Sequence, residues 1–371
     1  MSGIETFPLG DMALVRAPRS GVVAMVDLPT RAILEGLATG ARVGALARAH
    51  ARATGGEVQV ATARIAELRR AWRELDTPFR PAVPRLPPAE EELPTLDMRC
   101  RVGAATVRLR IWPPTLARIV AAVTAPARLG GDGTGGGPGE PVLEVRRVHG
   151  SYHLQGDGEH LLGTDDLMIA RSEILRWLIL ASHPGRAWLA VLHAAAVAGP
   201  AGAALLCGCS GAGKSTLTGL LLASGLELVT DDYAPLEMGT RLIWPVPFGL
   251  SVKEGSWPIL APHFPQLARA PLVRTRRRRQ RYLAPPALAR GPFPAACLVF
   301  PLYQPGAPAE LTRLEPAESL QLLTRSGGWY ENSRDRLAAL VDWIGSLPAY
   351  ALAYGNGAQA VAAVRALIGA R

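Results

Sequence analysis

Apolar positions near the start of the chain first form two short runs and then recur at helical spacing. Residues 13–28 read ALVRAPRSGVVAMVDL, in which two apolar runs flank the turn RSG, so two short strands are expected. Apolar residues then recur at the spacing of one helix face in three segments, which predicts helices at 29–38, 43–54 and 60–75. We therefore expect a compact first domain over residues 1–75.

The strand, strand, three-helix order and the run VVAMVDLPTRAIL resemble the PqqD-like family of winged-helix domains. This resemblance implies a small winged-helix-like α+β domain that recognises the leader of a precursor peptide. The residues alone leave two alternatives open, a structural cap and a nucleic-acid-binding winged helix.

A proline-rich stretch separates this unit from the rest of the chain. Residues 76–95 are rich in proline and acidic toward their end, which predicts an extended linker. Residues 96–190 then alternate between strand and helix patterns and are expected to form an N-terminal α/β part of the catalytic region. The expected elements are strands at 102–112 and 142–154, helices at 113–123 and 166–182, and a glycine-rich loop at 130–139.

One segment imitates a membrane span. Residues 187–207 are almost wholly apolar and long enough to cross a bilayer. However, His193 lies inside the run, and the turn sequence GPAG at 199–202 interrupts it. We therefore predict two buried strands joined by a hairpin, and no membrane association.

A phosphate-binding motif follows directly. The segment ALLCGCSGAGKSTLTGLLLASG predicts a buried strand, a glycine-rich loop and a helix, and GCSGAGKS fits the pattern G-x-x-x-x-G-K-[ST] in that context. Such a loop cradles phosphates with its amides, while Lys214 reaches the terminal phosphates and the Ser215 hydroxyl helps to hold Mg²⁺. We expect ATP or GTP to bind here. The expected contacts are Gly208, Cys209, Ser210, Gly211, Ala212, Gly213, Lys214, Ser215 and Thr216.

Two carboxylates and a histidine flank the motif. Asp231 and Asp232 end the expected strand LELVT, and ligands of α/β folds bind outside the carboxyl ends of strands. One carboxylate can act on Mg²⁺ while the other accepts a proton. His193 is either functional or a buried structural histidine. Glu254 is either a further Mg²⁺ ligand or a solvated loop residue.

The segments HAAAVAG, GCSGAGKSTL and LELVTDD, in this order, resemble the HPr kinase/phosphorylase family and the HPr-kinase-related proteins of peptide-maturation pathways. The likeness continues through PVPFGLSVKEGSW, ACLVFPLY and the C-terminal run LPAYALAYGNGAQAVAAVRALI. The resemblance implies an α/β P-loop kinase core of HPr kinase type over residues 191–371. It implies that Asp231 is the general base, Asp232 a metal-side or orienting carboxylate, and His193 the modulator. SVKEGSW replaces the family's acidic signature, so we do not expect phosphorolysis.

Charge narrows the choice of partners. The net charge of +9 favours anionic ligands, and of 40 basic residues only Lys214 and Lys253 are lysines. Lys253 is either a chance survivor or a compact ammonium needed at the phosphates. The arginine run at 274–281 is expected to lie beside the site and attract phosphate or an acidic peptide. Aromatic residues do not interleave with it, so nucleic acid is not the expected partner.

The sequence predicts an ATP-dependent kinase with Mg²⁺ that phosphorylates a Ser or Thr hydroxyl of a peptide recruited by the first domain. Two alternatives stay open: a kinase of a carrier protein or small hydroxylated molecule, and a nucleotide-binding regulatory protein with little turnover. The four cysteines form no C-x-x-C pair, and no secretion signal precedes residue 13, so we expect a reduced cytoplasmic chain. A homo-oligomer is compatible with this sequence.

Overall fold

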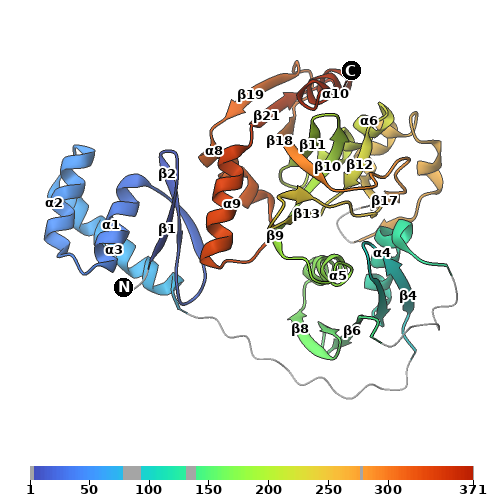
Figure 1. Cartoon of the computed structure of the whole chain (residues 1–371), viewed down its shortest axis with the longest axis horizontal. Coiled ribbons are helices and arrows are strands. Elements are labelled where there is room, and N and C mark those ends of the chain that lie inside the picture. Colours follow the sequence, from blue (N-terminus) through green and yellow to red (C-terminus); the bar gives the residue numbers. More distant parts are fainter. Residues whose placement is uncertain (1–3, 78–92, 131–138, 276–278, 371) are drawn as a thin grey trace.

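A computed structural model describes residues 4–77, 93–130, 139–275 and 279–370. Within these ranges the chain is a mixed α/β protein with four sheets and ten α-helices, which confirms the predicted mixed α/β class (Figure 1). Most of the predicted linker and of the glycine-rich loop lies outside the described residues, as does the middle of the arginine run.

The first unit contains one small antiparallel sheet and three helices. Its strands are β1 (Glu5–Leu9), β2 (Met12–Arg16) and β3 (Val23–Asp27). Its helices are α1 (Leu28–Ala38), α2 (Val43–Thr54) and α3 (Val58–Leu75). Asp27 caps α1 by accepting a hydrogen bond from the Thr30 amide at 2.7 Å, which fixes where the helix begins. The two predicted strands and three helices are confirmed, and β1 is an additional strand.

The first unit packs against the C-terminal part of the chain. Phe7, Leu9 and Leu14 share a buried core with helix α9 (Arg334–Ser346). The Asn332 amide nitrogen also donates a hydrogen bond to the Gly21 carbonyl at 2.7 Å, in the turn between β2 and β3. Because this core is shared, removing the first unit would expose apolar surface.

The second sheet has five strands covered on one face by helices α4 (Pro114–Thr124) and α5 (Leu167–Ala181). The strands are β4 (Leu96–Arg101), β5 (Thr106–Ile111), β6 (Val142–Val148), β7 (Ser151–Gly156) and β8 (Glu159–Thr164). The predicted single strands at 102–112 and 142–154 were wrong in extent. The first range contains only β5, the second strand of the β4–β5 hairpin, and the second range contains β6 and most of β7. Turn residues His149 and Gly150, both with positive φ, split the second run.

The third sheet has ten strands and forms the centre of the molecule. Eight follow the order β12-β10-β11-β18-β14-β13-β9-β20, while β21 pairs with β18 and β19. Helices α8 (Pro316–Ser326) and α9 pack on one face, and α6 (Lys214–Ala223) and α10 (Gly357–Leu367) on the other. The strands are β9 (Trp188–Leu192), β10 (Ala194–Gly199), β11 (Gly202–Cys207), β12 (Glu227–Thr230), β13 (Ala234–Glu237), β14 (Leu242–Ile243), β18 (Phe293–Tyr303), β19 (Glu310–Leu314), β20 (Gly328–Tyr330) and β21 (Ala349–Tyr354).

The apolar segment 187–207 supplies three of these strands rather than the two predicted. The hairpin of β10 and β11 is confirmed, and β9 is a separate strand that pairs with β13 and β20. His193 lies between β9 and β10, where the chain passes from one set of neighbours to another. None of the described helices is long and apolar enough to span a membrane.

A small fourth sheet completes the site region. It contains β15 (Leu250–Lys253), β16 (Leu272–Arg274) and β17 (Arg279–Leu283), with β17 in the middle. Short helix α7 (Trp257–Leu260) follows β15. Leu250 and Val252 are buried against α6, so β15 is held beside the loop that precedes this helix.

Candidate functional site

The loop between β11 and α6 depends on its glycines. Gly208, Gly211 and Gly213 all have φ between 96° and 139°, which L side chains rarely adopt. A Cβ on Gly213 would also lie 2.4 Å from the Tyr354 hydroxyl. The loop delivers the chain into the N-terminus of α6, where unpaired amides and the helix dipole favour an anion.

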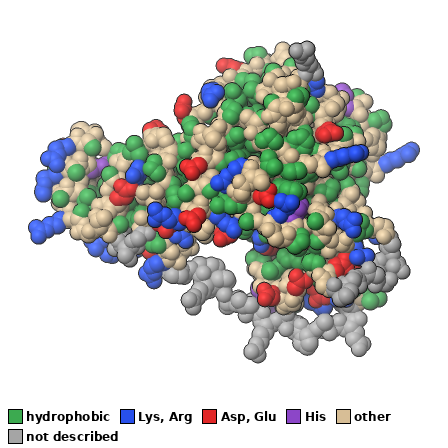
Figure 2. Space-filling view, viewed as in Figure 1, with side chains coloured by type: hydrophobic (Ala, Val, Ile, Leu, Met, Phe, Trp, Pro, Cys, Tyr) green, Lys and Arg blue, Asp and Glu red, His purple; other side chains and the backbone are tan. Residues whose placement is uncertain are grey.

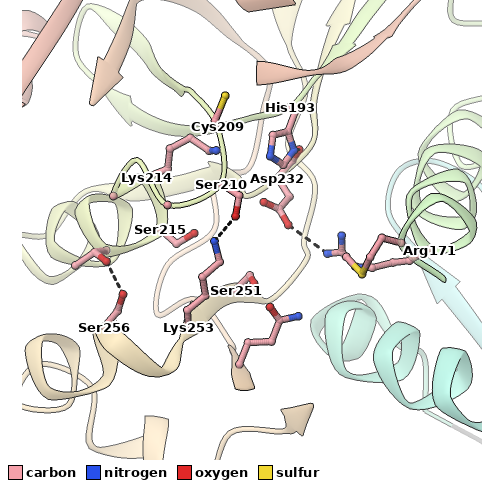
Figure 3. A pocket seen from close by; sticks show the side chains of 15 residues that line it. Arg171, His193, Cys209, Ser210, Lys214, Ser215, Asp232, Ser251, Lys253 and Ser256 are labelled. Atoms are coloured by element: carbon pink, nitrogen blue, oxygen red, sulfur yellow. Dashed lines mark hydrogen bonds and ion pairs between the residues drawn. The ribbon is translucent and has the colours of Figure 1, made fainter. Parts of the chain in front are cut away.

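A cavity of about 200 Å³ opens beside this loop (Figure 3). Its lining includes these residues singled out in the sequence: His193, Cys209, Ser210, Gly211, Gly213, Lys214, Ser215, Thr216, Asp232 and Lys253. It also includes Gln280, which belongs to the arginine run expected beside the site, and four residues that the sequence did not single out: Met168, Arg171, Ser251 and Ser256. Four predicted site residues of the described chain lie outside this lining: Gly208, Ala212, Asp231 and Glu254.

Asp232 faces the cavity and is held by Arg171. Its carboxylate lies 3.2 Å from the Arg171 guanidinium, and its backbone has φ of 67°, a sparsely populated region for a residue other than glycine. Burial raises the pKa of Asp232, but Arg171, His193 and Lys214 together outweigh burial and hold this pKa below its usual range. Asp232 is therefore ionised at neutral pH.

Asp231 does not line the cavity, although it precedes Asp232 in the chain. Its buried carboxylate accepts a hydrogen bond from the Ser251 amide at 2.8 Å, which ties the end of β12 to β15. Burial and the neighbouring Asp232 charge raise the pKa of Asp231 to about 7. The two adjacent carboxylates thus have opposite environments.

His193 contacts the same segment through its ring. Its Nδ1 atom lies 3.1 Å from the Asp232 backbone carbonyl, which can only accept, so Nδ1 carries the proton. Burial lowers the pKa of His193, and Lys214 and Arg171 lower it further against the opposing effect of Asp232. A neutral ring with this tautomer leaves Nε2 as a hydrogen-bond acceptor.

Two ammonium groups contact the loop. The Lys214 ammonium donates to the Gly208 carbonyl, and the Lys253 ammonium donates to the Ser210 hydroxyl at 2.7 Å (Figure 3). Lys253 ends β15, which carries its ammonium to the loop. Glu254, in contrast, pairs with Arg279 at 2.5 Å, with about half of its side chain exposed.

Arg171 is the site residue that sequence reasoning missed. It lies on the buried face of α5, and its Nε atom has no hydrogen-bond partner within the described part of the chain. Asp166 caps α5 by accepting from the Met168 and Ile169 amides, which sets the register that carries Arg171 inward. The sequence did contain one signal for Arg171: it falls on the same helix face as the apolar residues Ile174 and Leu178, where a charged residue is unusual.

The charges and oxygens of the cavity fit a phosphate with a divalent cation. Arg171, Lys214 and Lys253 outnumber the single carboxylate, which favours an anionic ligand. The Ser215 hydroxyl and Asp232 carboxylate are hard oxygen donors of the kind that Mg²⁺ prefers. Across the described ranges no group of three or more His, Cys, Asp or Glu could hold a metal. Such a partial donor set suits Mg²⁺, which usually shares its coordination with water and phosphate.

In comparisons with known proteins, no family model and no curated protein matches this chain.

Proposed function

We propose that this protein is an ATP-dependent kinase that phosphorylates a Ser or Thr hydroxyl of a peptide, with a P-loop kinase core similar to that of HPr kinase. The observation that carries this proposal is the convergence of Lys214, Lys253, His193 and Asp232 on one cavity beside a glycine-dependent loop. A phosphate-binding loop alone would suit many nucleotide-binding proteins. A carboxylate and a neutral histidine facing it suit transfer to an acceptor.

One group of residues acts on the phosphates of ATP, and another acts on the acceptor hydroxyl. The loop amides and the ammonium groups of Lys214 and Lys253 hold the phosphates and neutralise charge that develops on the leaving oxygen. Mg²⁺, held through Ser215, would add further charge neutralisation at the phosphates. The acceptor oxygen bonds to the γ-phosphorus, the bond from that phosphorus to the ADP oxygen breaks, and the hydroxyl proton leaves to a carboxylate.

The geometry favours Asp232 as the carboxylate nearest the acceptor. Asp232 lines the cavity, whereas the Asp231 carboxylate is engaged with the Ser251 amide. The raised pKa of Asp231 suits a base, but a base must first lie within reach of the proton, so position decides. We therefore exchange the roles implied by the family resemblance and make Asp231 the support that positions β15.

The first unit supports a peptide as substrate. Strands β1 and β3 are the two edges of its sheet, and every residue of β3 is partly exposed. An extended peptide can add to such an edge through main-chain hydrogen bonds. Basic and acidic side chains are interspersed over the visible face in Figure 2, without one continuous basic patch, which is less suited to nucleic acid.

The test is phosphorylation of precursor-like peptides. The full chain is incubated with ATP, Mg²⁺ and synthetic peptides that contain a single Ser or Thr, and mass spectrometry locates the added phosphate. Phosphate on the hydroxyl residue, with matching ADP release, supports the proposal. ATP binding without phosphorylation of any peptide refutes it and favours a regulatory nucleotide-binding protein.

A further inference from the structure

A second cavity of about 470 Å³ adjoins the phosphate cavity. The two cavities share Met168 and His193, and the second also reaches Tyr233, the residue after Asp232. One wall is formed by α5 and the other by β9 and β20. Its remaining lining residues are Asp166, Ile169, Ser172, Glu173, Arg176, Val191, Gly327, Gly328 and Trp329.

The walls of this second cavity favour an apolar group. Ile169 is 52% exposed and Met168 is 45% exposed, although both are large apolar residues. Glu173 and Arg176, the charged pair on the same helix, neutralise each other, and the Arg176 guanidinium lies 5.0 Å from the Trp329 ring centroid. Asp166, the other charged residue of the lining, accepts hydrogen bonds from the Met168 and Ile169 amides at the start of α5. A charged ligand group would therefore find little complementary charge here, whereas an aliphatic or aromatic group would cover exposed apolar surface.

The position of this cavity suits the acceptor. In phosphoryl transfer the attacking and leaving oxygens lie roughly in line, so the acceptor approaches from the side opposite the phosphate loop. Lys214 and Ser210 lie on the loop side of Asp232, and α5 lies on the other side (Figure 3). The second cavity opens along α5 and ends at His193, next to the carboxylate.

The outer end of the cavity leads to the first unit. Trp329 lines the cavity, and three residues further along the chain Asn332 donates its hydrogen bond to Gly21. Three residues span at most about 11 Å. Tyr330 packs against the same core as Val23 and Met25 of β3. The cavity residue Trp329 thus lies within about 11 Å of the residue that contacts the first unit.

We propose that the cavity between α5 and β20 binds the acceptor segment of the peptide and selects a large apolar side chain close to the phosphorylated Ser or Thr. This inference rests on the proposed kinase function. Ile169 is the residue that determines this specificity, because it contributes apolar surface to this cavity and does not line the phosphate cavity.

A positional peptide scan tests the proposal. Short peptides with one serine carry Leu, Phe, Asp, Lys or Gly at each flanking position in turn. The unaltered chain should prefer Leu or Phe at one position by about tenfold in kcat/KM, which corresponds to about 1.4 kcal/mol. In Ile169→Glu that same position should select Lys, and in Ile169→Lys it should select Asp. A merely structural role of Ile169 would not reverse the selected charge.

Leu161→Glu is the matched control, because Leu161 is an apolar residue of β8 that is 37% exposed and lies outside both cavity linings. It should keep the original preference. ATP binding by every variant, measured with a fluorescent nucleotide, verifies that the phosphate side is intact. Peptide phosphorylation without any positional preference, or with a preference that both Ile169 variants retain, overturns this inference and leaves the kinase proposal standing. Absence of peptide phosphorylation despite ATP binding overturns both.

Discussion

One wall of the phosphate cavity comes from a single segment within residues 209–216, whereas the opposite wall gathers Arg171, His193, Asp232 and Lys253 from four separate parts of the chain. We call these the loop wall and the side-chain wall. The loop wall consists mainly of backbone whose path its glycines permit. The side-chain wall depends on how α5, β9, β12 and β15 pack against one another.

This difference separates binding from chemistry. Backbone amides at a helix N-terminus recognise phosphate whatever the acceptor is, since they address charge alone. Side chains collected from several elements can instead be placed with respect to a reacting hydroxyl. Damage to the loop wall should therefore weaken every reaction of the nucleotide, while damage to the side-chain wall should reduce transfer more than binding.

The largest expected effect is on the loop wall. Lys214→Ala should reduce peptide phosphorylation by about 1,000-fold, because a charge aimed at the phosphates is lost in a confined site. Its ammonium bonds to a loop carbonyl rather than to core residues, so the unfolding temperature should change little. Steady-state kinetics and thermal unfolding of the same preparation measure both. Turnover at the unaltered rate would mean that transfer does not occur at this loop.

The two adjacent aspartates should respond differently. Asp232→Asn should lower kcat by about 100-fold, as expected for removal of a general base. In Asp231→Asn the amide oxygen can still accept from the Ser251 amide, so the loss should be below about tenfold. Measuring kcat and ATP affinity for both variants ranks them. The reverse order of effects would restore Asp231 as the base.

The sequence could predict the loop wall because its chemistry is local. The motif residues from Cys209 to Thr216 and the elements around them follow from neighbours in the chain, and most predicted helices are confirmed within a few residues. Asp232 was found because it ends a predicted strand close to the loop, and His193 because the pattern of segments resembles a family. Arg171 was missed because its role depends on a contact between α5 and Asp232, which follows the distant strand β12. The different environments of Asp231 and Asp232 likewise depend on the contact of Asp231 with β15, which no local pattern contains.

The next effect concerns the missed residue. Arg171→Met removes a hydrogen bond to an ionised partner, a loss of about 2 kcal/mol that would lower kcat by about thirtyfold if it acts fully in the transition state. It should also destabilise the fold, because the Asp232 carboxylate, whose side chain is 20% exposed, loses its partner.

The double variant Arg171→Met with Asp232→Asn separates these contributions. It should recover part of the lost unfolding free energy but none of the activity. Arg108→Met is the control, because Arg108 pairs with Asp97 on a partly exposed sheet face and should cost less than about 1 kcal/mol. Equal destabilisation by the Arg108 and Arg171 variants would show that burial does not increase the contribution of the Arg171–Asp232 pair to the unfolding free energy.

The smallest effect should come from exchanging one cation for another at Lys253. Its ammonium donates to Ser210 at 2.7 Å across the cavity, so it links the side-chain wall to the loop wall. Lys253→Arg keeps the charge, but a planar guanidinium is larger and directs its donors in a fixed fork, which this narrow position does not match. We expect kcat to fall by about tenfold, or about 1.4 kcal/mol, with ATP affinity changed less. Arg118→Lys, a conservative exchange at an exposed position of α4 outside both cavity linings, should leave kcat unchanged. If Lys253→Arg also keeps full activity, charge alone is needed at this position, and the shape of the ammonium does not explain why lysine is retained there.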